Sequence, residues 1–89
     1  MDAVFTKHED PSHGWLEVDE IELKHLGVNS GAFTDYSFRK GRRLFLEEDC
    51  DASKFYELWK GKFGSYPRVV VEHHEGDFPE DYGLYGIHE

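Results

Sequence analysis

Six histidines are the residues of this sequence best suited to bind a metal or carry a proton. His8 and His13 lie in the N-terminal segment, close to the carboxylates of Glu9 and Asp10. Imidazole and carboxylate groups are common zinc ligands, but this spacing matches no specific metal motif. We therefore predict solvated histidines, with no resident metal and no cofactor.

A second histidine pair, His73 and His74, lies on a predicted strand. Adjacent side chains of a strand point to opposite faces, so these two cannot both bind one metal unless the strand bulges. The alternative to solvated histidines is a metal-dependent enzyme whose ligands come from a small set of residues: His8, Asp10, His13 or His73.

Cys50 is the only cysteine, which excludes an intrachain disulfide and fits a reducing cytoplasm. It lies in the segment LEEDCD among four acidic residues. Negative charge disfavours the thiolate that a nucleophilic cysteine needs. No Ser–His–Asp or Cys–His arrangement is readable beside it, so we predict no catalytic residue and no enzyme.

Nineteen acidic residues against ten basic ones give a formal net charge of −9. Such a charge repels nucleic acid and anionic membranes and favours basic protein partners. The alternative is that the charge serves only solubility. No apolar run approaches the roughly 20 residues that span a bilayer, and the N-terminus has no secretory pattern. We expect a cytoplasmic protein that does not act on membranes.

The segment RKGRR at residues 39–43 is the one basic cluster. Its Lys40-Gly41 pair resembles the start of the third-strand motif in RNA-recognition motifs, which bind RNA on a four-stranded sheet. The positions that hold base-stacking aromatics in that motif are here Arg42, Leu44 and Glu47. A nucleic-acid-binding module that uses residues 39–43 is therefore an alternative that we predict against.

The N-terminal half predicts one short strand and one short helix. We expect residues 1–13 to form an irregular arm, because this segment is poor in apolar residues and ends in turn formers. The segment WLEV at residues 15–18 predicts the first strand. Asp19 and Glu22 have the spacing of a capping box, so a helix begins there and ends at Gly27.

Residues 33–38 and 42–47 predict a hairpin whose register depends on the turn at Gly41. A two-residue Lys40-Gly41 loop would divide the apolar side chains between both faces of the hairpin. A three-residue loop, with Gly41 as the bulge residue, gathers four apolar side chains on one face: Tyr36, Phe38, Leu44 and Leu46. We predict this second register.

A second helix follows, capped by Asp49 or Asp51. Its apolar positions form a core-facing stripe: Phe55, Leu58, Trp59 and Phe63. RVVVEHHE at residues 68–75 predicts the last strand. The order βαββαβ predicts an α+β, ferredoxin-like fold, with a four-stranded antiparallel sheet and two helices on one face. We expect one domain over residues 1–89, with an aromatic and acidic tail at 76–89 that is docked or partly disordered.

The predicted register leaves Trp15, Arg43 and Phe45 on the sheet face that points away from the core. Aromatic and arginine side chains are enriched in protein interfaces. The competing explanation is that the aromatic residues of the tail fold back and cover this face. Both can hold in a homodimer.

HGWLEV, followed by an aromatic and basic hairpin and then LEEDCDA, resembles small uncharacterised proteins of bacteriophages and mobile elements. The similarity covers about residues 13–58. The resemblance implies an accessory protein that acts by binding a host protein. It assigns no activity, and no functional residue is carried over from it.

The sequence therefore predicts a non-enzymatic, acidic protein-binding module that inhibits a host nucleic-acid-processing enzyme in the manner of a DNA mimic. The predicted partner is a host protein with a basic surface, and a second copy of the chain is a further expected partner. The predicted partner-binding residues are Trp15, Arg43, Phe45, Glu47, Glu48, Asp49 and Asp51.

Overall fold

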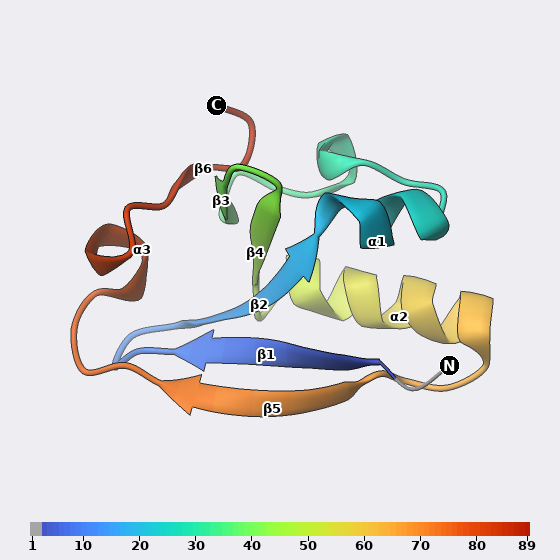
Figure 1. Cartoon of the computed structure of the whole chain (residues 1–89), viewed down its shortest axis with the longest axis horizontal. Coiled ribbons are helices and arrows are strands. Elements are labelled where there is room, and N and C mark those ends of the chain that lie inside the picture. Colours follow the sequence, from blue (N-terminus) through green and yellow to red (C-terminus); the bar gives the residue numbers. More distant parts are fainter. Residues whose placement is uncertain (1–2) are drawn as a thin grey trace.

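The computed structural model describes residues 3–89, which form one mixed sheet and three α-helices (Figure 1). The sheet has six strands in the order β5-β1-β2-β4-β3-β6. The strands are β1 (Val4–Glu9), β2 (Gly14–Asp19), β3 (Phe38–Lys40), β4 (Arg43–Glu47), β5 (Arg68–His73) and β6 (Tyr85–Gly86). The helices are α1 (Glu20–His25), α2 (Asp51–Phe63) and α3 (Phe78–Asp81), with a 3-10 turn at Ser30–Ala32. None of the helices within residues 3–89 is long and apolar enough to cross a membrane.

The ferredoxin-like prediction is wrong, because the sheet has six strands and one parallel pair, β1 with β5. The predicted irregular arm contains β1, which lies between β2 and β5. Hydrogen bonding to a neighbour on each side stabilises this strand despite its low apolar content. Its parallel partner is far away in the sequence, so local composition does not reveal the pairing. The strand predicted at residues 68–75 is present as Arg68–His73, but it is not the last strand, because β6 follows it, and it lies at an edge of the sheet.

One face of the sheet packs against α1 and α2 (Figure 1). The residues of β2 and β4 that point to this face have no exposed surface: Leu16, Val18, Leu44 and Leu46. From α2, Phe55 and Trp59 meet the ring of Phe5 edge to face, with centroids 5.3 and 5.1 Å apart. Burying each such side chain stabilises the fold by about 1.5–3 kcal/mol. Three residues of the predicted stripe, Phe55, Trp59 and Phe63, thus face the main core, whereas Leu58 lies outside it and Ala52 and Tyr56 join instead.

The first part of the C-terminal tail packs on the opposite face of the sheet, whereas Ile87 near its end is buried in the main core. Phe78 of α3 has no exposed surface, and its ring centroid lies 5.8 Å from that of Trp15 and 5.6 Å from that of Phe45. Phe38 and Leu84 complete this second apolar cluster. The sequence left two explanations for this face, a protein interface or a tail that folds back over it, and in the structure the tail covers it.

The register of the β3–β4 hairpin differs from the predicted one. Lys40 pairs with Arg43 and Phe38 pairs with Phe45, so the turn consists of Gly41 and Arg42, with Gly41 at a φ of 58°. Phe38 consequently shares a face with Phe45 and points away from the main core. The prediction assumed that only one face is buried, but the tail buries the other face as well.

The capping box predicted for α1 is confirmed. The backbone N–H of Ile21 donates to Asp19 Oδ1 at 3.0 Å, and the N–H of Asp19 donates to Glu22 Oε1 at 2.8 Å. After the helix, Gly27 has a φ of 75°, as expected for a glycine that ends a helix. Local sequence therefore determines both ends of α1.

The caps predicted for α2 are wrong. The N-cap residue is Cys50, whose side chain makes no capping hydrogen bond. Instead, the carboxylate of Glu47 accepts the backbone N–H groups of Asp49 at 3.1 Å and Cys50 at 3.0 Å. This contact binds the end of β4 to the start of the helix and fixes the approach of α2 to the sheet.

Candidate functional site

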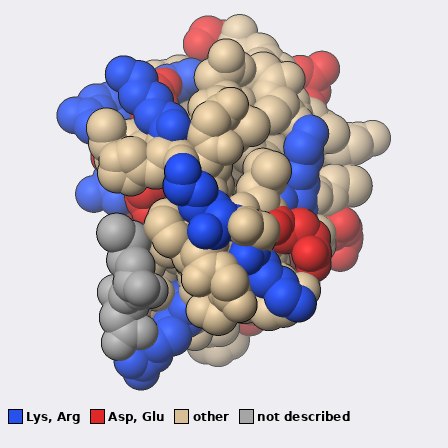
Figure 2. Space-filling model, turned by 90° about the vertical axis from the view of Figure 1, so that its right-hand side faces the viewer, with Lys and Arg blue, Asp and Glu red and all other residues tan. Residues whose placement is uncertain are grey.

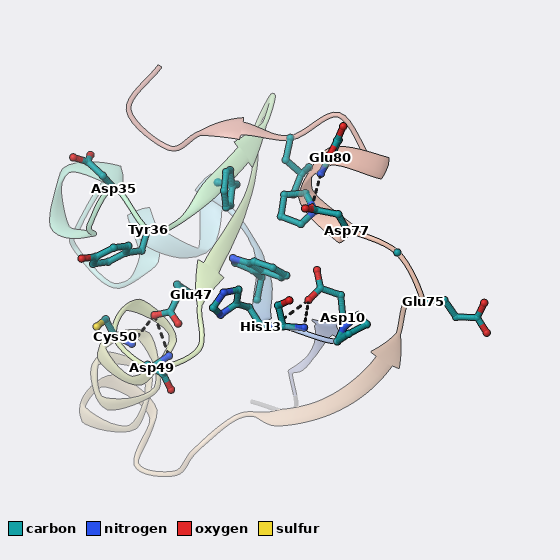
Figure 3. A pocket seen from close by; sticks show the side chains of 17 residues that line it. Asp10, His13, Asp35, Tyr36, Glu47, Asp49, Cys50, Glu75, Asp77 and Glu80 are labelled. Atoms are coloured by element: carbon teal, nitrogen blue, oxygen red, sulfur yellow. Dashed lines mark hydrogen bonds between the residues drawn. The ribbon is translucent and has the colours of Figure 1, made fainter.

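An open groove of about 1210 Å³ lies where the β1–β2 turn, the segment after β4 and the tail come together (Figure 3). Among the described residues that line it, none is Lys or Arg and seven are acidic: Asp10, Asp35, Glu47, Asp49, Glu75, Asp77 and Glu80. His13 is the one titratable base that lines it. We call this feature the acidic groove.

Aromatic and apolar side chains line the same groove: Trp15, Tyr36, Phe38, Pro79 and Leu84. Tyr36 is 67% exposed, whereas Trp15 is 4% exposed. The Nε1 atom of Trp15 is buried and, within residues 3–89, has no hydrogen-bond partner. The groove therefore combines negative charge with apolar surface.

Asp10 connects the two sides of the groove. Its Oδ1 accepts the backbone N–H groups of Ser12 and His13, both at 2.9 Å, and its Oδ2 accepts that of Phe78 at 3.0 Å. Burial tends to raise the pKa of Asp10, but these N–H donors and the nearby His13 ring hold it below the ordinary value of 3.8. The ionised carboxylate thus fixes the start of α3 to the β1–β2 turn.

Two more groove acids have structural roles. Glu47 binds the N–H groups before α2, and Asp77 Oδ1 accepts the backbone N–H of Glu80 at 3.2 Å as the cap of α3. Asp49, Glu75 and Glu80 are exposed, and Figure 3 shows Glu75 at the rim, pointing away from the cavity. The exposed acids are the ones available to a partner.

The structure brings three of the predicted partner-binding residues to the groove, namely Trp15, Glu47 and Asp49. Glu48 lies outside it and binds Lys7, with Oε1 3.3 Å from Nζ. Arg43 is exposed outside it, with Nη1 3.5 Å from Oε2 of Glu17. These two side chains therefore do not add to the acidic groove.

The two other predicted residues, Phe45 and Asp51, are buried, at 7% and 2% exposure. Phe45 lies beneath the tail. The carboxylate of Asp51 accepts the N–H of Thr34 at 3.0–3.1 Å, the hydroxyl of Thr34 at 2.8 Å and the hydroxyl of Ser37. Asp51 thus holds the segment before β3 on the first turn of α2, which is a structural role.

Sequence reasoning missed the groove acids of the β1–β2 turn and of the tail. The signal was present in EGDFPED at residues 75–81, where four acids surround one buried aromatic residue. Only the docking of this segment on the sheet brings these acids opposite Glu47 and Asp49.

Charge is distributed unevenly between the two ends of the molecule. The β1–β2 turn and α3 lie at the left of Figure 1, whereas Figure 2 views the right-hand end, where Lys and Arg side chains are spread over the surface. This end includes the last turn of α2, which carries Lys60 and Lys62. The molecule therefore has an asymmetric distribution of charge in addition to its net negative charge.

His8 lies beneath the tail, outside the groove. Its Nε2 is 2.7 Å from Oε1 of Glu17, and its Nδ1 is 2.9 Å from Nε2 of His74 and 3.8 Å from Oε2 of Glu72. His73 points to the other face, with Nδ1 3.6 Å from Oε1 of Glu9. The structure thus groups His8 with residues of β5 and its end, and not with the predicted set.

The other members of the predicted metal set are separate from His8. Asp10 binds backbone N–H groups, and His13 is exposed at the groove. The useful signal in the sequence was the spacing of Glu72 and His74, which places both on one face of a strand. This spacing points to a site that includes His8 only once β1 is known to be the strand next to β5.

Comparison with known proteins gives no relative: no family model, curated protein or solved structure matches this chain. The resemblance to bacteriophage and mobile-element proteins stays an expectation. The chemistry of the acidic groove is therefore the basis for a proposed function.

Proposed function

We propose that this protein is a non-enzymatic binding module whose acidic groove holds a Lys- and Arg-rich segment of a partner protein. The observation that supports this proposal is the lining of the groove, where seven acidic residues lie beside aromatic side chains and no Lys or Arg occurs among the described residues. Carboxylates attract ammonium and guanidinium groups, and aromatic faces bind the same cations.

The size of these interactions favours a segment over a single cation. An exposed ion pair contributes about 0.2–1 kcal/mol, and a cation on an exposed aromatic ring contributes about 0.5–1 kcal/mol. One side chain would therefore bind only weakly. Several cations along one segment add up to a stable complex, and the uneven charge of the molecule orients the approaching partner.

Proteins that process nucleic acids carry such basic surfaces, because they bind phosphates with Lys and Arg. The proposal extends to inhibition of a host enzyme of this class, with groove carboxylates in the place of phosphates. Because the groove is concave, it can hold an extended basic segment of the partner. It is less suited to enter a partner's cleft that is built for a nucleic-acid duplex. A cytoplasmic location, in the host cell if the chain is phage-encoded, agrees with the single cysteine.

A titration with a labelled peptide of alternating Lys, Arg and Gly tests the proposal by fluorescence anisotropy. The test variant Asp49→Asn/Glu75→Gln/Glu80→Gln removes two exposed acids that line the groove and Glu75 at its rim. The control variant Glu57→Gln/Asp81→Asn/Glu89→Gln removes three exposed acids that do not line the groove, with the same change in net charge. We expect the first variant to lose about tenfold in affinity, equal to about 1.4 kcal/mol, and the control to change little.

Equal losses in both variants would show that only net charge matters and would refute a groove site. A native chain that binds no peptide at low salt would refute the proposal altogether. Displacement of the native chain from a basic nucleic-acid enzyme by duplex DNA would support the inhibitor role.

For the expected homodimer, the free edge of β5 is the surface that we propose. Val70 and Val71 are 52% and 48% exposed there, and long apolar edge strands pair readily. Antiparallel pairing of two copies about Val70 would set Arg68 of one copy opposite Glu72 of the other. Light scattering tests this: we expect a native dimer and a monomeric Val70→Lys variant. A native chain that stays monomeric at high concentration would contradict it.

A further inference from the structure

We propose that His8, Glu72 and His74 form a binding site for a divalent transition-metal ion of the zinc type. Each residue offers one ligand atom, and the three atoms lie within 4.8 Å of one another. β1 contributes His8, β5 contributes Glu72, and His74 follows β5 directly. The parallel register, with His8 beside Glu72, holds all three on the face that the tail covers.

The contact of His8 with Glu17 leaves Nδ1 of His8 unprotonated, so a metal ion can take the place of the His74 hydrogen bond there if His74 carries its proton on Nδ1. Nε2 lies 2.7 Å from Oε1 of Glu17, and a carboxylate accepts, so Nε2 carries the proton. In the neutral ring Nδ1 is then unprotonated, and its lone pair points toward His74. A carboxylate that accepts from the outer nitrogen of a metal-bound imidazole orients the ring and strengthens the ligand. Glu17 is in this position.

The spacing of the ligand atoms suits a tetrahedral ion. Two ligands about 2.05 Å from zinc at a tetrahedral angle lie about 3.3 Å apart. His8 Nδ1 and His74 Nε2 are 2.9 Å apart, and His8 Nδ1 and Glu72 Oε2 are 3.8 Å apart. Small movements of the His74 and Glu72 side chains, with His8 held still, bring both separations to that value.

The surroundings fix His8 and leave the other side of the site open. The His8 ring is stacked on that of Phe78, with centroids 4.4 Å apart and planes 9° from parallel, and its side chain is 8% exposed. The Glu72 side chain is 56% exposed, so an ion and a water ligand reach the site from solvent. Two imidazoles and one carboxylate favour zinc over magnesium or calcium, which prefer oxygen ligands.

Without a metal, His74 Nε2–H donates to His8 Nδ1, and the pair is an ordinary hydrogen bond. The two roles differ in one measurable respect, because only a metal site binds an ion with a defined stoichiometry. Isothermal titration of the chelator-treated chain with zinc chloride tests this. We expect one equivalent to bind with micromolar affinity, a higher Tm, and no comparable effect of magnesium.

His73 and His74 provide a matched pair of variants on opposite faces of the same segment. We expect His74→Gln to weaken zinc binding at least about tenfold and His73→Gln to leave it unchanged. Glu72→Gln, at an exposed position, gives the same test should the half-buried His74 prove necessary for folding. Cobalt in place of zinc is expected to give the strong visible absorption of a tetrahedral site, and His74→Gln is expected to remove it.

Equal losses in the His73 and His74 variants would overturn the proposal, and so would a native chain that binds no zinc at micromolar concentration. Glu72 also belongs to the proposed β5 interface, so the titration is repeated on Val70→Lys. Retained binding there locates the site within one chain. Binding lost with the dimer would contradict the site as proposed.

Discussion

His8 and Phe78 stack almost parallel, and through this contact the tail is attached to a strand in the interior of the sheet. The same Phe78 ring contacts Trp15 and Phe45. One tail residue therefore packs against side chains of three strands, β1, β2 and β4. The groove wall that α3 supplies depends on it as well.

Replacing Phe78 by Ala is therefore expected to detach the first part of the tail. Removing a fully buried Phe costs about 3–5 kcal/mol, so the part of the tail before Ile87 loses its main apolar anchor, while Ile87 stays buried in the main core. Chymotrypsin should then cut at Tyr82, Leu84 and Tyr85, and urea unfolding should show the lost stability. Tyr36→Ala, at a 67% exposed position, is the control and should change stability by no more than about 0.5 kcal/mol. A tail that stays resistant to chymotrypsin in Phe78→Ala would contradict this role.

The pKa of Asp10 predicts how the tail responds to acid. Because folding lowers this pKa, the carboxylate stabilises the fold above the ordinary value of 3.8, and the contribution is lost as the pH falls through the folded value. We expect the protection of the tail to fall below about pH 4. In Asp10→Asn the tail should already be less protected at neutral pH and should respond less to acid. Hydrogen exchange of the Phe78 amide measures both effects.

Asp51 and Asp49 lie two positions apart in the same acidic segment, but replacing them by Ala should reduce the stability of the fold by very different amounts. Asp51→Ala leaves the Thr34 and Ser37 donors without their acceptor in a buried place, which we expect to cost about 2–4 kcal/mol. Asp49→Ala removes an exposed carboxylate and should change stability by less than about 0.5 kcal/mol. Thermal unfolding of both variants measures the difference, and similar values would exclude the buried role of Asp51.

Two glycines at the end of α2 are expected to have opposite effects. Gly61 lies within the helix with open space around it, so Gly61→Ala should stabilise the chain by about 0.5–1 kcal/mol. Gly64 ends the helix with a φ of 86°, so Gly64→Ala should destabilise it by about 1–2 kcal/mol. Urea unfolding compares the two, and a destabilised Gly61→Ala would show that the glycine serves the packing of α2.

Signals that lie within a few residues of each other were sufficient to predict local structure. The capping box of Asp19 and Glu22, the stripe of α2 and the valines of β5 all belong to this class. The alternation of β2 also predicted that Trp15 points away from Leu16. These features depend on backbone geometry and near neighbours, which the sequence displays directly.

The errors came from contacts between distant segments. β1 was missed because its two neighbours in the sheet stabilise it, and the hairpin register was wrong because the tail buries Phe38. The sequence did not predict a groove, and only three of the predicted partner-binding residues line it, namely Trp15, Glu47 and Asp49, since its other wall belongs to the tail. The same reason hid the grouping of His8 with His74.

The parallel pairing of β1 with β5 has a consequence for how the chain folds on the ribosome. β1 is synthesised early, but one of its edges has no partner until β5 has been made, where Glu72, the partner of His8, lies 64 positions further along the chain. The β1–β2 hairpin and α2 can form during this interval, because their contacts are local. During this interval the nascent chain exposes one edge of a strand that lies in the interior of the finished sheet. Pairing of β5 with β1 then brings His8, Glu72 and His74 together in one late step, after which only β6 remains to be added at the other edge of the sheet.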